Sequence, residues 1–282
     1  MGNRVSSPAA SLRGEIIARA RDWAAVTASP SFESDGGVVF FEPFTSGDGP
    51  AHGNFLTGSY GAILRDVHWY ERLDKRHAGS RFLPADRRRA RETDSCTSSD
   101  ALLLNVMCHP DSGAVRSLVF GVKGPPEFGV GGAVPKLIDG ELRGDESELD
   151  MVFRGRRGAI SCIIEAKLTE TDFTKRDASV VESYAELASV FDVGKLARTV
   201  SGEYENYQLI RNLLAAHHHT ARFWLICDAR RPDLLNRFQD TLRAVRRSEF
   251  ADRCSAVTWL EIGSASSDAV QAFLTDKYGI EP

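Results

Sequence analysis

The segment ELDMVFRGRRGAISCIIEAKLTE, residues 148–170, constrains the fold more than any other part of the chain. It contains two mainly apolar runs separated by the turn sequence GRRG at residues 155–158, a pattern that predicts a β-hairpin. The second run carries Glu165 and Lys167. Lone charges are strongly disfavoured in a strand that enters a protein interior, so this pair requires a chemical or structural reason.

The length of the turn predicts how the two strands pair. A two- or four-residue loop would place Arg154 opposite Ala159. In that register Glu148 faces Glu165, and Asp150 becomes a diagonal neighbour of Glu165, because cross-strand partners share a face. The apolar face then contains Leu149, Met151, Phe153, Ile160, Cys162, Ile164 and Ala166, and the charged face contains Glu148, Asp150, Val152, Ser161, Ile163, Glu165 and Lys167.

The charged face suits a divalent cation. Directly opposed carboxylates destabilise a sheet, and a cation held by Asp150 and Glu165, with Glu148 as a further ligand, would offset that repulsion. The Cβ atoms of diagonal neighbours lie roughly 7–8 Å apart, a gap that two carboxylates can close on Mg²⁺ at about 2.1 Å. Lys167 could then reach a water or a phosphate oxygen, which suits hydrolysis of a phosphodiester. Since E-x-K occurs roughly once by chance in a chain of this length, a solvated sheet surface is the alternative.

Composition limits the classes of function. A net charge of −4 and a pI near 6.0 argue against general binding of polyanions, so a nucleic acid would have to use a local patch. Residues 72–91, with eight Lys or Arg and two acids, form such a patch. The patch could contact DNA phosphates or could be ordinary solvated surface, and the sequence does not decide between the two. No apolar run approaches the ~18 residues of a membrane span. The five cysteines, odd in number and without C-x-x-C, indicate reduced thiols and a cytoplasmic protein.

Periodicity along the chain predicts alternating helices and strands, and therefore an α/β domain, residues 96–282, ending in a helix–strand–helix extension. Residues 1–95 are expected to form an N-terminal elaboration packed on this core. The Gly- and Pro-rich residues 124–140 are expected to form a loop. Helices are expected at residues 11–26, 61–76, 98–108, 178–191, 204–217, 233–246 and 267–278. Strands are expected at residues 38–44, 114–123, 148–154, 159–168, 222–228 and 256–262.

Asp150, followed by the EAK tripeptide at residues 165–167 on the next strand, resembles the D…(D/E)-x-K signature of the PD-(D/E)XK, or restriction-endonuclease-like, nuclease superfamily. Three segments together are similar to a family of predicted bacterial restriction endonucleases: SSDALLLN at residues 98–105, EAKLTE at residues 165–170 and YQLIRN at residues 207–212. The resemblance covers about residues 54–245. It implies an αβββαβ core with a mixed central sheet flanked by helices, plus N-terminal and C-terminal additions.

The resemblance assigns the elements of this core. They would be helix 98–108, strands 115–122, 148–154 and 159–168, helix 204–217 and strand 222–228, with helix 178–191 as an insertion. It also places Asp100 on the first helix, where superfamily members carry an extra acid and some relatives carry glutamine. The participation of Asp100 is therefore open.

The resemblance further implies a set of site residues. Asp150 and Glu165 would ligate Mg²⁺, helped by the Ala166 carbonyl, with Mn²⁺ as a substitute. Lys167 would orient or activate the attacking water. Gln208 lies on the helix where related nucleases often place a polar residue facing the site. An ordinary amide on the helix surface is an equally good interpretation of this residue.

These observations predict a Mg²⁺-dependent endonuclease that hydrolyses DNA, with restriction or defence as its setting. Two alternatives stay open. One is a catalytically silent nuclease fold that binds DNA or supports an assembly, and the other is an enzyme acting on small phosphate esters. A homodimer would let one site per chain cut both strands of a duplex, but the sequence shows no interface.

Overall fold

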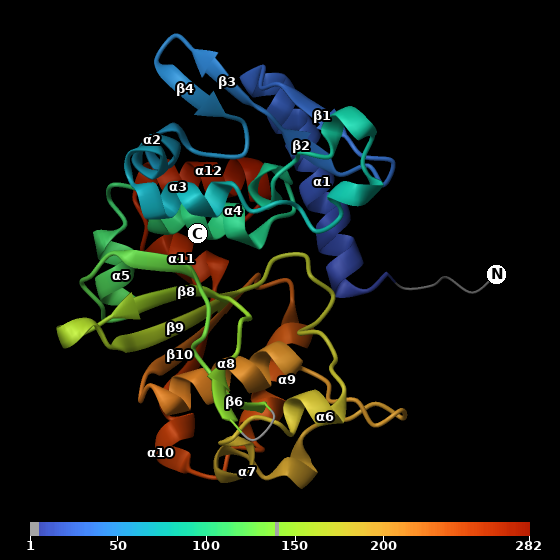
Figure 1. Ribbon diagram of the computed structural model, residues 1–282. Helices are drawn as coiled ribbons and strands as arrows, with labels where there is room; N and C mark the ends of the chain where they lie inside the picture. Colours follow the sequence, from blue (N-terminus) through green and yellow to red (C-terminus); the bar gives the residue numbers. More distant parts are fainter. Residues whose placement is uncertain (1–5, 139–140) are drawn as a thin grey trace. The chain divides into compact units, whose positions relative to one another are not determined.

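The computed structural model describes residues 6–138 and 141–282 (Figure 1). These residues form two compact units. The first contains the chain up to Lys123 together with residues 228–230 and 258–282, and the second contains residues 124–227 and 231–257. Within the described part of the chain, no helix is both long enough and apolar enough to span a membrane. The packing of residues 1–95 on the remainder stays a prediction.

The second unit is built on a five-stranded sheet in the order β11-β10-β9-β8-β5. Its centre is β9 (Ile160–Ala166), which pairs antiparallel with β8 (Leu149–Arg154) and parallel with β10 (Arg222–Cys227). The edge strand β5 (Pro126–Val130) pairs antiparallel with β8, and β11 (Cys254–Thr258) lies beside β10. This mixed sheet confirms the predicted α/β fold class.

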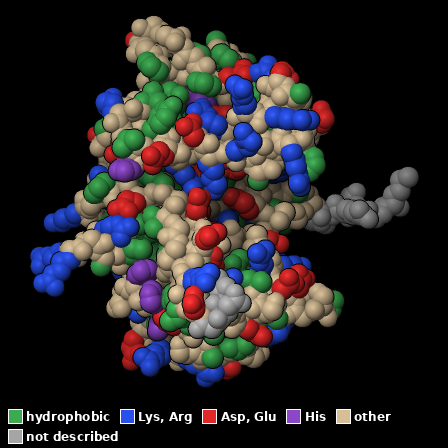
Figure 2. All heavy atoms as spheres, in the orientation of Figure 1, with side chains coloured by type: hydrophobic (Ala, Val, Ile, Leu, Met, Phe, Trp, Pro, Cys, Tyr) green, Lys and Arg blue, Asp and Glu red, His purple; other side chains and the backbone are tan. Residues whose placement is uncertain are grey.

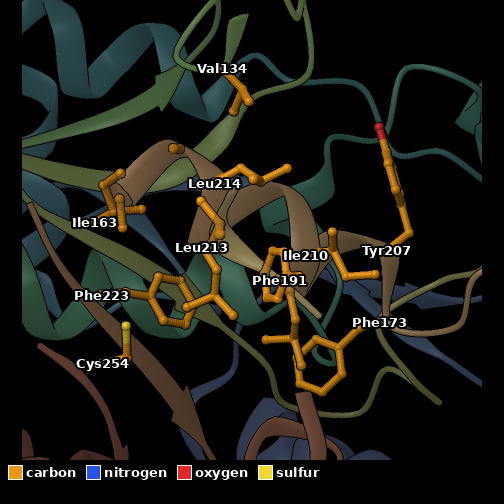
Figure 3. Close-up of a cluster of buried hydrophobic side chains, with 14 of the residues drawn as sticks. Val134, Ile163, Phe173, Phe191, Tyr207, Ile210, Leu213, Leu214, Phe223 and Cys254 are labelled. Atoms are coloured by element: carbon orange, nitrogen blue, oxygen red, sulfur yellow. The ribbon is translucent and has the colours of Figure 1, made fainter. Parts of the chain in front are cut away.

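Two helices of the second unit pack on the sheet. α8 (Tyr207–His218) contacts β9 and β10, and α9 (Pro232–Leu242) contacts α8 and β10 (Figure 1). Figure 3 shows Leu213 of α8 beside Phe223 of β10 in a buried cluster that also contains Ile163 of β9. Each fully buried side chain of this size contributes roughly 1.5–3 kcal/mol. The apolar residues of α8 therefore fix the helix on the sheet and determine where its polar residues lie.

The remaining elements of the second unit are short. They are the hairpin β6–β7 (Pro135–Ile138 and Glu141–Gly144), α6 (Ala178–Val181), α7 (Leu187–Val190) and α10 (Ser248–Ala251). The first unit contains α1 (Pro8–Thr27), α2 (Thr57–Arg65), α3 (Val67–Leu73), α4 (Ser99–Met107), α5 (Gly113–Leu118), α11 (Trp259–Ser264) and α12 (Asp268–Phe273). It also contains the hairpins β1–β2 (Ser31–Glu33 and Val39–Phe41) and β3–β4 (Pro43–Ser46 and Gly49–His52).

The expected strand at 114–123 is wrong, and the expected loop at 124–140 is wrong where β5 and β6 lie, while its residues 139–140 are outside the described residues. Residues 113–118 form α5, and the edge strand β5 lies inside the supposed loop. A short apolar run does not distinguish a helix from a strand by itself. β5 tolerates Pro126 because proline is acceptable as the first residue of an edge strand. With β5 in place of 115–122, the order α4, β5, β8, β9, α8, β10 matches the expected αβββαβ succession.

Other expected elements differ in extent, and the strand expected at 38–44 is divided into β2 and β3. The helix expected at 61–76 is interrupted at Asp66, whose extended backbone ends α2 and whose side chain caps α3. The helix expected at 178–191 is two short helices, α6 and α7. The strand expected at 256–262 ends at Thr258, because that side chain accepts from Glu261 N and forms the capping box that begins α11.

The hairpin exists, but its predicted register is wrong. Met151 pairs with Ile164 and Arg154 pairs with Ile160, with a bulge between Phe153 and Arg154. The turn is longer than two or four residues, and Arg157 adopts a left-handed conformation within it (φ 64°). From Met151 to Phe153 the partners are therefore displaced by two positions from those expected, and at Arg154 by one. Since side chains alternate with a period of two, this displacement preserves the predicted sorting of faces.

Candidate active site

Asp150, Glu165 and Lys167 lie at one end of the β8–β9 hairpin. The strands are antiparallel, so the start of β8 and the end of β9 meet at the same end of the sheet. The observed register brings Asp150 level with Glu165, one position beyond the Met151–Ile164 pair. Lys167 follows β9 directly, and its backbone N–H donates to Ile226 O at 2.8 Å. The structure therefore brings the three predicted catalytic side chains together.

The carboxylate of Glu165 is almost completely buried and held from two sides. Its residue is 1% exposed. Oε2 accepts a hydrogen bond from Asn212 Nδ2 at 2.6 Å, and Oε1 lies 2.7 Å from Lys167 Nζ in an ion pair. Among the described residues Oε1 has no partner with hydrogen-bond geometry. Buried charged groups are usually paired or coordinate metals, so this oxygen could also coordinate a metal cation.

Asp150 is half-buried at the start of β8. Its Oδ2 accepts a hydrogen bond from the backbone N–H of Ala166 at 3.0 Å. Ala166 lies between Glu165 and Lys167, so this bond fixes Asp150 relative to both. Asp150 is therefore bonded to the residue between Glu165 and Lys167, on the neighbouring strand.

Lys167 is an ammonium enclosed by acids. Its residue is 5% exposed. Burial alone would lower the pKa of Lys167, but the negative charges of Glu165, Glu170 and Asp150 outweigh burial and raise the pKa. Phe173 lies beneath it, with Nζ 5.8 Å from the ring centroid. Two carboxylates against one ammonium leave an excess of negative charge at this end of the hairpin.

Two neighbouring residues of α8 support the site, and neither was assigned a role from the sequence. Asn212, fully buried, donates to Glu165 and accepts from Arg211 Nε through Oδ1 at 2.9 Å. Arg211 Nη2 donates to the backbone carbonyl of Glu148 at 2.8 Å. α8 thus holds the residue before β8 and the carboxylate in β9. The YQLIRN segment contains both residues, but an amide and an arginine on a helix do not reveal by themselves which way they point.

A fully buried arginine fixes the segment after β9. Arg231 Nη1 donates to Leu168 O at 3.2 Å and to Glu170 O at 2.7 Å. Its Nε and Nη2 donate to the carboxylate of Asp233 at 3.0 and 2.9 Å. Glu170 also accepts from Leu168 N at 2.7 Å. The backbone just beyond Lys167 is therefore tightly bonded.

Three other predicted residues make no hydrogen bond or ion pair to Asp150, Glu165 or Lys167 that the structure describes. Glu148 is exposed and is not opposite Glu165, because the observed register pairs the strands differently. The side chain of Gln208 is half-buried and has no hydrogen bond to a described residue, although it is one turn before Asn212 on the same face of α8. Asp100, in the first unit, pairs with Arg72 Nη2 at 2.8 Å.

The comparison with protein families decides the relationship. A family model described as "Restriction Endonuclease associating with ARP" matches residues 28–279. The chain belongs to this family. Searches of curated proteins and of solved structures each find no match.

The chemistry of the site is compatible with a hard cation. Carboxylate and carbonyl oxygens are the ligands that Mg²⁺ prefers, and Asp150 and Glu165 lie level on neighbouring strands. The described residues contain no group of three or more His, Cys, Asp or Glu side chains placed to hold a metal. Magnesium commonly binds through one or two carboxylates and completes its shell with water and substrate phosphate, so a pair of acids suffices.

Proposed function

We propose that this member of the restriction endonuclease family is a Mg²⁺-dependent endonuclease that hydrolyses DNA phosphodiester bonds and belongs to the PD-(D/E)XK superfamily. The observation that supports this most is the level placement of Asp150 and Glu165 across β8 and β9, with Lys167 Nζ 2.7 Å from Glu165. Such a group has no evident structural purpose, because one hydrophobic pair would stabilise the sheet better than a buried ion pair.

Each side chain has a distinct task in this proposal. Asp150 and Glu165, with the Ala166 carbonyl, would hold Mg²⁺, and Asn212 keeps the Glu165 carboxylate in the required orientation. When bound, the cation would stabilise charge on the phosphate and acidify a water. Lys167 donates hydrogen bonds from Nζ to the attacking water or to a phosphate oxygen. Glu148 as an additional ligand and Gln208 as a site-facing residue stay predictions.

Conservative substitutions test the proposal. Supercoiled and linear DNA would be incubated with the protein and Mg²⁺, Mn²⁺ or EDTA. Lys167→Met, Glu165→Gln and Asp150→Asn keep the side-chain volume, and each should reduce cleavage by about 100- to 1,000-fold. Lys195→Met and Glu127→Gln make the same chemical changes at residues that are exposed and ion-paired. These controls should cut normally.

Circular dichroism would show that each variant is folded. If Lys167→Met cuts as fast as wild type, the cleavage belongs to another site or another protein. Glu148→Gln and Gln208→Ala, measured in the same assay, decide whether those residues contribute. Sedimentation with and without duplex DNA would test the predicted homodimer.

The second candidate is a nuclease fold that binds or assembles without cutting. The family description supports it by naming an association with ARP. Binding of DNA without metal-dependent cleavage, over many sequences and with both cations, would favour this candidate over the first.

A further inference from the structure

The first unit contains a compact loop, residues 76–91, which we call the arginine loop. Its ends are joined: Arg76 and Arg91 form an antiparallel bridge, and His77 N donates to Ala90 O at 3.1 Å. One residue outside, Glu92 N donates to Lys75 O at 2.7 Å. Compact loops of ~6–16 residues with adjoining ends are packed by their own side chains and frequently carry function.

The arginine loop has a defined internal structure. Ser80 N donates to His77 O at 2.9 Å, and Gly79 N donates to His77 Nδ1 at 3.0 Å. Two short 3₁₀ turns follow, η1 (Ser80–Phe82) and η2 (Ala85–Arg87), with Leu83 buried between them. Side chains on this loop are therefore presented from a fixed backbone.

The charge of the arginine loop is almost entirely positive. It contains six arginines and one acid. Arg87 pairs with Glu42 and Asp86, and Arg91 pairs with Asp94. The other four arginines are exposed, and none pairs with a carboxylate in the described ranges: Arg76, Arg81, Arg88 and Arg89. Figure 2 shows Lys and Arg side chains gathered over the part of the first unit drawn in turquoise beside β1 in Figure 1.

An exposed aromatic side chain accompanies these charges. Phe82 is 73% exposed, and Arg81 Cζ lies 4.6 Å from its ring centroid. Phe82 also borders a pocket of about 420 Å³, whose lining includes Phe40, His77 and Thr97. A large exposed ring stacked with a guanidinium is unusual on a surface without a ligand, since aromatic residues are mostly buried.

We propose that the arginine loop is a DNA-binding surface. Arg76, Arg81, Arg88 and Arg89 hold successive backbone phosphates, and Phe82 stacks on an unpaired base at the mouth of the pocket. Guanidiniums without a carboxylate partner supply the sequence-independent part of DNA affinity, and aromatic rings stack on bases of any sequence. An acidic protein partner would pair with the exposed arginines but would not account for the exposed Phe82 ring. The inference rests on the proposed function for its choice of DNA.

The arginines are tested by binding without catalysis. Fluorescence anisotropy with labelled duplex and single-stranded oligonucleotides in EDTA measures the affinity of the full chain. Arg88→Ala/Arg89→Ala should weaken binding at least tenfold and reduce the salt slope, log Kd against log salt, by roughly 1.8 for duplex DNA, at about 0.9 for each phosphate contact. Arg143→Ala/Arg243→Ala removes the same charge at exposed arginines that already pair with acids, and should leave binding within about twofold.

Phe82 has its own readout. Phe82→Ala should weaken binding of single strands about tenfold, by loss of one stacked base, and leave duplex binding unchanged, whereas Phe82→Tyr should retain both. Equal loss in the arginine-loop and control double variants, or unchanged binding in the loop variants, would overturn the proposal. Lys167→Met binds normally if the arginine loop is the DNA contact, so a failure of the catalytic assignment is distinguishable from a failure of this one.

Discussion

Lys277 provides a direct test of how a buried amine affects the stability of the first unit. It is 1% exposed, and Nζ donates to Gly53 O at 3.0 Å and to Asn54 Oδ1 at 2.5 Å. Its nearest ring is Phe41, with the centroid 4.6 Å from Nζ. No carboxylate in the described part of the chain pairs with it. Burial lowers the pKa of Lys277 well below its usual 10.5, against a smaller opposing effect of Cys96.

The expected effect of Lys277→Met depends on pH. Well above pH 10.5 the amine is neutral in both states, so only the lost hydrogen bonds to Gly53 and Asn54 count, and the variant should be less stable by about 1–3 kcal/mol. Below that pH the unfolded chain binds a proton that the folded lysine does not. Wild-type stability therefore falls by about 1.4 kcal/mol for each unit of decreasing pH, down to the folded pKa. The variant lacks this loss, so the order of stability should reverse between about pH 8 and pH 10.

Urea denaturation followed by circular dichroism, at unit intervals from about pH 7 to pH 10, measures the gap between wild type and Lys277→Met. Groups that titrate equally in both proteins cancel in this difference. Lys195→Met is the matched control, because Lys195 is 66% exposed and should show a constant gap. A constant gap for Lys277→Met as well would refute the reasoning, since the lysine would then carry the same charge folded and unfolded.

Two further substitutions probe the second unit. Asn212→Ala leaves the buried Glu165 carboxylate without its amide donor, so the free energy of unfolding from urea titration should fall by about 1.5–3 kcal/mol; an unchanged midpoint would show that the bond is dispensable. Burial alone would raise the pKa of Glu186, but hydrogen bonds from His218 and His217 outweigh burial and lower it. A carboxyl group with a lowered pKa stabilises the fold above pH 4.5, and this stabilisation is lost as the pH falls. Glu186→Gln should therefore melt at a lower temperature than wild type near pH 6 and at the same temperature near pH 3. Equal melting temperatures at both pH values would contradict this role of Glu186.

The hairpin shows which parts of a fold can be predicted from sequence. The alternation of apolar and charged residues predicted the faces of β8 and β9, because that pattern is a direct consequence of the pleat. The predicted register was wrong because the turn length was ambiguous: a bulge lies between Phe153 and Arg154, and Arg157 takes a left-handed conformation usually reserved for glycine. The error moved Glu148 away from Glu165 and brought Asp150 level with it.

The candidate site was predictable where chemistry is concentrated in few residues. Asp150, Glu165 and Lys167 were identified because charges within an apolar hairpin require an explanation. Asn212 was not, because a polar residue on an amphipathic helix is ordinary, and only the packing of α8 shows that it points at a carboxylate. β5 was missed for a related reason: its proline and glycine are typical of loops, and the partner strand that accepts them is distant in sequence.

Arg211 and Asn212 are consecutive on α8. Arg211 donates to the backbone carbonyl of Glu148, just before β8, and Asn212 donates to the carboxylate of Glu165, near the end of β9. A slight tilt of that helix would pull on both arms of the hairpin together. A ligand that shifts α8, or a substitution among its buried apolar residues, would therefore displace Asp150 and Glu165 without contacting either carboxylate.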